Sequence, residues 1–314
     1  MYPIWLGSAL VIGCLLAVQA SVNQQLNKAV GSPYGASTLQ LSVAAGALAV
    51  LAAAVGAIGA VGLLSPVQPW WLLLGGVASP LYITAGILLF PRLGALTAVG
   101  LFVTGQVFAS LVLDLFGLLA VPRQPLRIGI TLGALAVLVG ITVTVRAQHP
   151  AAVTGAPTAS RTAAQSSWVG LGLLAGAVLP IQGAINAQLQ QDIERPVAVA
   201  TISFLVATVT IAIVLVLLLA LRRTPTPQLR PLRGMPWWGW LGGFCAAAYV
   251  TATFLLIPTI GAAVTVALTV TGQQLASALI DQYGWFRMPQ RRLTLPRVAG
   301  LALLIAGSVL VQLS

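Results

Sequence analysis

The sequence predicts an all-α integral membrane protein in which about ten transmembrane helices form two inverted five-helix repeats. Three observations support this fold class. Of the 314 residues, 59% are hydrophobic and only 6% are charged, whereas soluble domains carry roughly 25% charged residues. The apolar runs are long and uninterrupted, unlike the alternating strands of a membrane barrel. Finally, polar motifs of the first half recur in the second half.

Proline, glycine and arginine residues divide the apolar sequence into ten segments, and a membrane-crossing helix needs about 20 residues. We expect helices near residues 4–25, 36–63, 70–90, 94–116, 126–146, 168–189, 197–221, 237–257, 261–282 and 296–313. Tryptophans fall near the ends of these segments, where their amphipathic rings lie at the headgroup level. The chain therefore divides into a first repeat at 1–147, a flexible linker at 148–166 and a second repeat at 167–314.

Matching polar residues define the two repeats. The matched pairs are Gln19 with Gln182, Asn23 with Asn186, Tyr82 with Tyr249, Thr104 with Thr271, Gln106 with Gln273 and Asp114 with Asp281. The first two pairs are 163 residues apart and the other four are 167 residues apart. Because each repeat holds an odd number of helices, the second repeat enters the membrane upside-down relative to the first. Inverted repeats are typical of transporters, because two equivalent halves can exchange inward-open and outward-open roles.

The net charge of +11 does not indicate nucleic-acid binding, because the basic residues lie between apolar segments. Two arginine clusters, at 222–233 and 287–297, fall on the cytoplasmic side if both termini lie outside. Only Arg123, Arg127 and Arg195 then face outward. We therefore expect a multi-pass protein of the inner or plasma membrane with both termini outside. The lipid bilayer and a small-molecule solute are its expected partners, and nucleic acid is not.

Two motifs carry a family resemblance. Gln-x-x-x-Asn-x-x-Leu begins at Gln19 and again at Gln182, and Thr-Gly-Gln-x-x-x-Ser-x-x-x-Asp-x-x-Gly occupies 104–117 and 271–284. The chain resembles, over nearly its whole length outside the linker, the fused two-unit form of the YdcZ-type family of the drug/metabolite transporter superfamily. The resemblance implies a ten-helix bundle with a central cavity between the halves, and transport of an unnamed cargo. The membrane-embedded glutamate of the related small multidrug-resistance transporters has no counterpart in either first helix.

The depth of the polar residues along their helices predicts a layered site. Gln106 precedes Asp114 by eight residues, or about 12 Å at 1.5 Å per residue, which puts it near the midplane. The residues expected to line a midplane cavity are Gln106, Gln273, Tyr82, Tyr249, Thr104 and Thr271. The residues expected to act in gating or coupling are Asp114, Asp281, Asn23, Asn186, Gln19 and Gln182. We expect Asn186 with Asp114 at the outer mouth and Asn23 with Asp281 at the inner mouth.

Each assignment has a structural alternative. Asp114 and Asp281 stand near the C-terminal ends of their helices, where a carboxylate opposes the helix dipole and is costly unless it is paired or wetted. Each could therefore hydrogen-bond the following turn or act as a protonatable coupling site. The neutral glutamine, asparagine and tyrosine side chains could line a cavity or join neighbouring helices.

Transport of a small polar or amphipathic metabolite by alternating access is the leading interpretation, with protons as a candidate coupling ion. The alternative is a lipid-linked carrier or flippase with a laterally open cavity. A membrane enzyme is disfavoured, because the one histidine, His149, lies in the expected linker and no Ser/His/Asp or Cys/His set can be assembled. We expect no cofactor and no metal.

Overall fold

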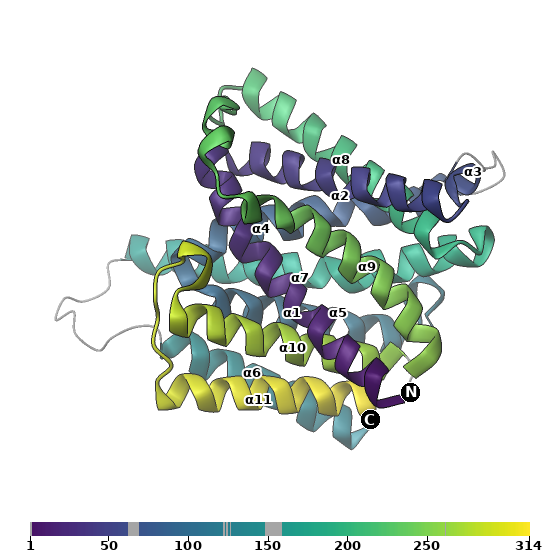
Figure 1. The fold of residues 1–314 in the computed structure, drawn as a ribbon. Helices are drawn as coiled ribbons and strands as arrows, with labels where there is room; N and C mark the ends of the chain where they lie inside the picture. The colour runs from purple at the N-terminus through teal and green to yellow at the C-terminus, as the bar shows by residue number, and fades with distance from the viewer. Residues whose placement is uncertain are drawn as a thin grey trace.

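The computed structural model shows a bundle of helices (Figure 1). It describes residues 2–61, 69–121, 123, 125, 127–147, 159–260 and 262–314. Within these ranges every regular element is an α-helix or a short 3₁₀ helix. The predicted all-α fold class is confirmed.

Five long helical segments form the first repeat. They are α1 (Tyr2–Val30), α2 (Pro33–Ala54), η1 (Trp70–Val77) continuing into α4 (Ala78–Leu93), α5 (Ala95–Phe116) and α6 (Ile128–Arg146). The short helix α3 (Ile58–Val61) follows α2, and the 3₁₀ turn η2 (Leu118–Ala120) follows α5.

Five corresponding segments form the second repeat. They are α7 (Ala159–Ile193), α8 (Pro196–Ala220), η4 (Trp237–Trp240) continuing into α9 (Leu241–Ile260), α10 (Ala262–Tyr283) and α11 (Leu295–Leu313). The turn η3 (Arg230–Gly234) precedes η4, and η5 (Trp285–Arg287) follows α10. Eight segments in the described part are long and apolar enough to cross a membrane. Helices α9 and α10, the counterparts of α4 and α5, complete the ten.

Turn residues end the helices at matched positions. Gly117 and Gly284 both adopt the left-handed backbone conformation, with φ of 64° and 65°, where α5 and α10 end. This conformation is cheap for glycine because it has no Cβ. The repeat extends to the residues that follow, because Leu119 and Phe286 also have positive φ values of 53° and 57°. The backbone of the two turns is therefore duplicated along with the sequence.

Two expected boundaries differ from the structure by more than the others. The helix expected at 36–63 ends at Ala54. The chain turns at Gly56, because its φ of 68° is incompatible with a right-handed helix. The helix expected at 168–189 begins earlier, at Ala159, so the expected linker 148–166 is helical from that residue on. Alanine, arginine and glutamine in this stretch favour helix. Residues 148–158, which include His149, lie outside the described residues.

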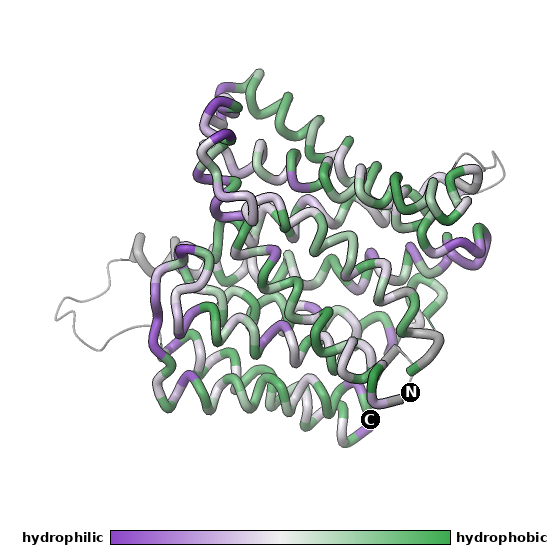
Figure 2. The backbone as a smooth tube through the Cα atoms, viewed as in Figure 1, coloured by the Kyte–Doolittle hydropathy of each residue, from purple (hydrophilic) through white to green (hydrophobic). Residues whose placement is uncertain are grey.

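The bundle has two distinct ends. The first residues of α1 and the last residues of α11 lie at one end, which we call the terminal face (Figure 1). The loops at 221–236 and 284–294 lie at the opposite end, which we call the basic face. Of the fifteen Lys and Arg residues, only Arg123, Arg127 and Arg195 belong to the terminal face. Figure 2 shows hydrophilic residues gathered at the two ends and apolar helices between them.

The two repeats are interlocked. Helix α1 packs against α9 and α10 of the second repeat, whereas α7 packs against α4 and α5 of the first. Helices α2 and α8 pack together, as do α6 and α11. Glycines permit the closest approaches at matched positions: Gly13 lies against the backbone of Thr269, and Gly176 against that of Phe102. A Cβ at either glycine would overlap the facing carbonyl group.

Candidate solute cavity between the repeats

A cavity of about 320 Å³ lies between the two repeats. Helices α1 and α4 of the first repeat and α7, α8 and α9 of the second line it. Its polar lining residues are Gln19, Ser79, Tyr82, Gln182, Asn186, Gln190, Tyr249 and Thr253. Apolar side chains such as Leu16, Ile83 and Phe204 form the rest of the wall, and none of the described lining residues is charged.

The cavity extends toward the terminal face. Along α7 its lining residues run from Gln182 through Asn186 to Gln190, close to the end of this helix at Ile193. Gly183 and Ala187 lie on the same wall and are exposed. This part of the cavity is therefore accessible from outside the bundle.

Tyr82 and Tyr249 both line the cavity. Gln273 lies behind Tyr82 rather than in the cavity wall, and its Nε2 donates a hydrogen bond to the Tyr82 hydroxyl oxygen at 2.9 Å. The Tyr82 ring also packs against Phe102, with 4.9 Å between ring centroids. Because Tyr82 accepts from Gln273, its own O–H remains able to donate into the cavity.

The matched residue Gln106 has a different environment from Gln273. Gln106 does not line the cavity, and its Nε2 has no hydrogen-bond partner in the described part of the chain. The two threonines of the same motif bond within their own helices: Thr104 Oγ1 donates to the Gly100 carbonyl at 2.8 Å and Thr271 Oγ1 to the Ala267 carbonyl at 2.7 Å. Neither threonine lines the cavity between the repeats.

Gln19 and Gln182 line the cavity with different partners. The Gln182 amide exchanges hydrogen bonds with the Ser79 hydroxyl at 2.8 Å and 3.1 Å. The position that corresponds to Ser79 in the second repeat is Ala246, which offers no hydroxyl. Gln19 is only 4% exposed, and its Oε1 has no hydrogen-bond partner among the residues the structure describes. Gln19 is thus a buried amide whose oxygen is unpaired within the described part of the chain.

Asn23 and Asn186 each pack against a glycine of the opposite repeat. The Asn23 amide oxygen lies against Gly242, and the Asn186 amide oxygen lies against the matched Gly75. Asn186 also donates from Nδ2 to Ser203 Oγ at 3.1 Å, and it alone of the two asparagines lines the cavity. The two asparagines therefore pack against the opposite repeat at matched positions.

Asp281 faces the start of α5 at the basic face and not the cavity. Its carboxylate accepts hydrogen bonds from the backbone N–H groups of Ala95 at 2.7 Å and Leu96 at 3.2 Å. Arg297 Nη2 lies 2.6 Å from the same carboxylate, and both side chains are buried. A carboxylate is favourable at a helix N-terminus because it complements the helix dipole. Asp281 thus links α10 to α5 and α11.

Asp114, the counterpart of Asp281, is half-buried near the end of α5. The position in α6 that corresponds to Arg297 is Ile130, which supplies no cation. The Asp281–Arg297 pair is the one ion pair found in the described part of the chain. No hydrogen bond joins Asn186 to Asp114, or Asn23 to Asp281, within that part.

Sequence reasoning missed the role of Arg297, which it assigned to topology. One signal was present: Arg297 stands inside the last apolar segment, where a cation requires a buried partner. It also gave no role to Gln25 and Gln188, although both belong to the recurring motif. Gln25 Nε2 donates to the Phe286 carbonyl at 2.9 Å, and Gln188 Nε2 donates to the matched Leu119 carbonyl at 2.6 Å.

The sequence and the fold were compared with those of known proteins. A family model described as "Putative inner membrane exporter, YdcZ" matches residues 4–143 and 167–310, one match for each repeat. A search of curated proteins found no match. A solved crystal structure is similar to this chain over 98% of both chains, with a TM-score of 0.57 and 16% sequence identity. That similarity concerns the fold.

Proposed function

Because this chain belongs to the YdcZ family of inner membrane exporters, we propose that it moves a small polar or amphipathic metabolite by alternating access between its inverted repeats. The chain is a multi-pass membrane transporter of the drug/metabolite transporter superfamily. The cavity between the repeats is the proposed solute site. Proton coupling is part of the proposal, as is an orientation with both termini outside.

One observation carries the proposal: an uncharged cavity with hydrogen-bonding groups lies where the two repeats meet. The hydroxyls of Tyr82 and Tyr249 and the amide of Gln19 supply polar contacts, whereas Leu16 and Phe204 supply apolar ones. Ligand sites combine an apolar wall with a few polar groups that fix orientation. Such a lining favours a neutral or amphipathic solute over an ion.

The difference between the two faces supports an alternating mechanism. The cavity reaches toward the terminal face, whereas at the basic face Asp281 ties α10 to α5 and α11. In the proposed mechanism, opening the cavity to the basic face separates Asp281 from the N–H groups of Ala95 and Leu96. Protonation of Asp281 would remove its charge and weaken its pair with Arg297, which is a route by which protons could drive the change.

Counterflow in proteoliposomes tests the proposal. Purified protein would be screened against neutral and amphipathic metabolites, with and without a pH gradient. We expect accelerated exchange of at least one solute and slower exchange in Gln273→Ala, which removes the support of Tyr82. Thr131→Ala, an exposed position on α6, is the matched control. Exchange no faster than in empty liposomes for the whole panel would reject the transport mechanism.

Asp281→Asn tests the coupling step separately. If protons act through Asp281, the variant should keep counterflow and lose its response to the pH gradient. An unchanged pH response in a folded Asp281→Asn variant would remove proton coupling at this residue and leave the solute site standing.

A further inference from the structure

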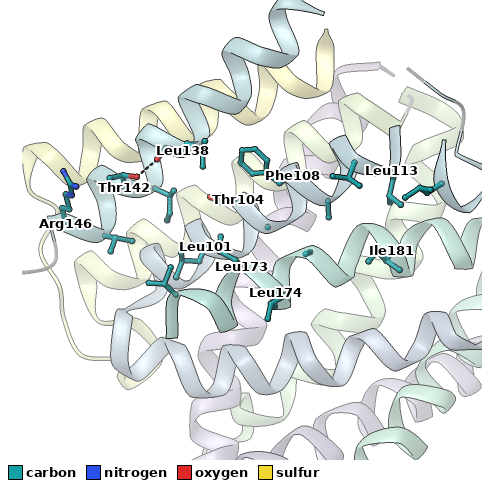
Figure 3. A pocket seen from close by; sticks show the side chains of 18 residues that line it. Leu101, Thr104, Phe108, Leu113, Leu138, Thr142, Arg146, Leu173, Leu174 and Ile181 are labelled. Carbon is teal, nitrogen blue, oxygen red and sulfur yellow. Dashed lines mark hydrogen bonds between the residues drawn. The ribbon is translucent and has the colours of Figure 1, made fainter. Parts of the chain in front are cut away.

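A second hollow, separate from the solute cavity, lies on the outer side of the bundle. This groove has a volume of about 780 Å³ and runs between α5, α6 and α7 (Figure 3). It shares no lining residue with the solute cavity. Several of its lining residues are large, apolar and exposed, including Leu138, Leu174 and Val112. In a membrane such a surface is covered by hydrocarbon.

The groove has the length of a lipid chain. Its lining residues on α5 run from Leu101 to Leu113, which at 1.5 Å per residue is about 18 Å. Half of a hydrocarbon core is about 15 Å thick, so an acyl chain from one leaflet fits within the groove. The Thr142 hydroxyl donates to the Leu138 carbonyl at 2.7 Å, so it presents no free donor to the groove.

A cation stands at one end of this groove. Figure 3 shows Arg146 at the end opposite Leu113, and Arg146 is the exposed last residue of α6 at the basic face. Nearby, the Arg92 guanidinium lies 4.3 Å from the ring centroid of Trp168, which directly precedes the lining residue Val169. None of the described lining residues is acidic. Guanidinium groups at the headgroup level attract phosphate.

The second repeat does not reproduce this arrangement. The position in α11 that corresponds to Arg146 is Leu313, at the terminal face. The combination of apolar groove and cation is therefore specific to α5, α6 and α7, and it follows from the sequence rather than from the repeat symmetry.

We propose that this groove binds one anionic phospholipid, with an acyl chain between α5, α6 and α7 and the phosphate on Arg146. The acyl chain supplies the dispersion contacts that the side chains of the open groove lack. The phosphate neutralises a cation that has no acidic neighbour among the lining residues. This inference is independent of the identity of the transported solute.

Native mass spectrometry of the full chain tests the proposal with phosphatidylglycerol and phosphatidylcholine of identical acyl chains. We expect the wild type to prefer phosphatidylglycerol. Arg146→Gln should reduce that preference about fivefold, which is the effect of one cation near a headgroup. Arg223→Gln, an exposed arginine on the same face that does not line the groove, should leave the preference unchanged.

Filling the groove gives the second readout. Ala109→Trp places a ring where the acyl chain would lie and should lower binding of both lipids, and Ala109→Leu is the milder variant if the larger one does not fold. Equal losses in Arg146→Gln and Arg223→Gln would show diffuse surface attraction and overturn the site. Unchanged lipid binding in a folded Ala109 variant would also overturn it.

Discussion

Asp281 and Asp114 occupy the same position in the two repeats, but their surroundings differ among the described residues. Asp281 is buried, caps the start of α5 and pairs with Arg297, whereas Asp114 is half-buried and its repeat offers Ile130 in place of the arginine. The backbone of the two turns beyond them is nevertheless alike, as Gly117 and Gly284 show. Among the described residues, the arginine that pairs with Asp281 therefore distinguishes the mouth at the basic face from the other.

Gln182 and Gln19 also occupy matched positions, in the cavity wall, and differ in their hydrogen-bond partners. Both line it, but Ser79 satisfies Gln182, whereas Ala246 leaves Gln19 without an equivalent partner. We therefore expect one glutamine to stabilise the structure and the other to contact a solute. The following predictions test how far the two repeats differ.

The largest expected effect is at the Asp281–Arg297 pair. Arg297→Ala leaves the Asp281 carboxylate buried without its cation and should lower the free energy of unfolding by about 3–5 kcal/mol. The comparison variant is Asp114→Asn, which removes a half-buried carboxylate and should change stability by less than about 1 kcal/mol. Chemical denaturation in detergent micelles measures both. Similar losses in the two variants would mean that the mouths are equivalent.

The glycine contacts should behave symmetrically, in contrast to the aspartates. Gly13→Ala and Gly176→Ala each place a Cβ against a backbone carbonyl of the other repeat. Each should cost about 1–3 kcal/mol of stability, as overpacking does. Gly46→Ala is the control, because no atom lies within 4 Å of its added Cβ. A cost at only one of the two positions would break the structural equivalence of the repeats.

The two cavity glutamines should separate stability from transport. Gln182→Leu leaves the Ser79 hydroxyl unpaired and should lower stability by about 1 kcal/mol. Gln19→Leu removes no hydrogen bond of its Oε1 to the protein, so it should keep stability and slow counterflow about fivefold, the value of one hydrogen bond. The reverse pattern would assign the solute contact to Gln182.

The smallest effect is expected from restoring the missing hydroxyl. Ala246→Ser places a serine at the position that corresponds to Ser79, the partner of Gln182. Gln19 should then form a hydrogen bond with the new hydroxyl and should be less available to bind the solute. The apparent solute affinity in counterflow should fall by a factor of about two to five. Ala247→Ser, a neighbour that does not line the cavity, is the matched control. An unchanged affinity would mean that Gln19 does not contact the solute.

Much of the fold could be predicted because the bilayer constrains it. A membrane helix must be long and apolar, so uninterrupted runs predicted the ten helical segments, and matched motifs predicted the two inverted repeats. The errors fell at positions that the bilayer does not constrain. Gly56 ends α2 within a continuous apolar run, and α7 begins at Ala159, where a polar helix can extend beyond the membrane.

The side-chain contacts were harder to predict because they depend on packing between distant segments. Depth along a helix predicts the level of a side chain, as for Tyr82 and Tyr249, but it gives no rotation about the helix axis. Thr104 and Thr271 therefore lie elsewhere, each bonded within its own helix. Gln273 supports Tyr82 from behind, and the partner of Asp281 comes from the next helix along the chain.

The bond from Gln25 to the Phe286 carbonyl joins residues 261 positions apart. A chain that emerges from the ribosome N-terminus first therefore inserts α1 long before its acceptor has been synthesised. Until α10 and its turn arrive, α1 must carry its polar side chains in the membrane with temporary partners. Contacts this distant in sequence form late in folding. The final packing of the first helix thus waits for nearly the whole protein to be made.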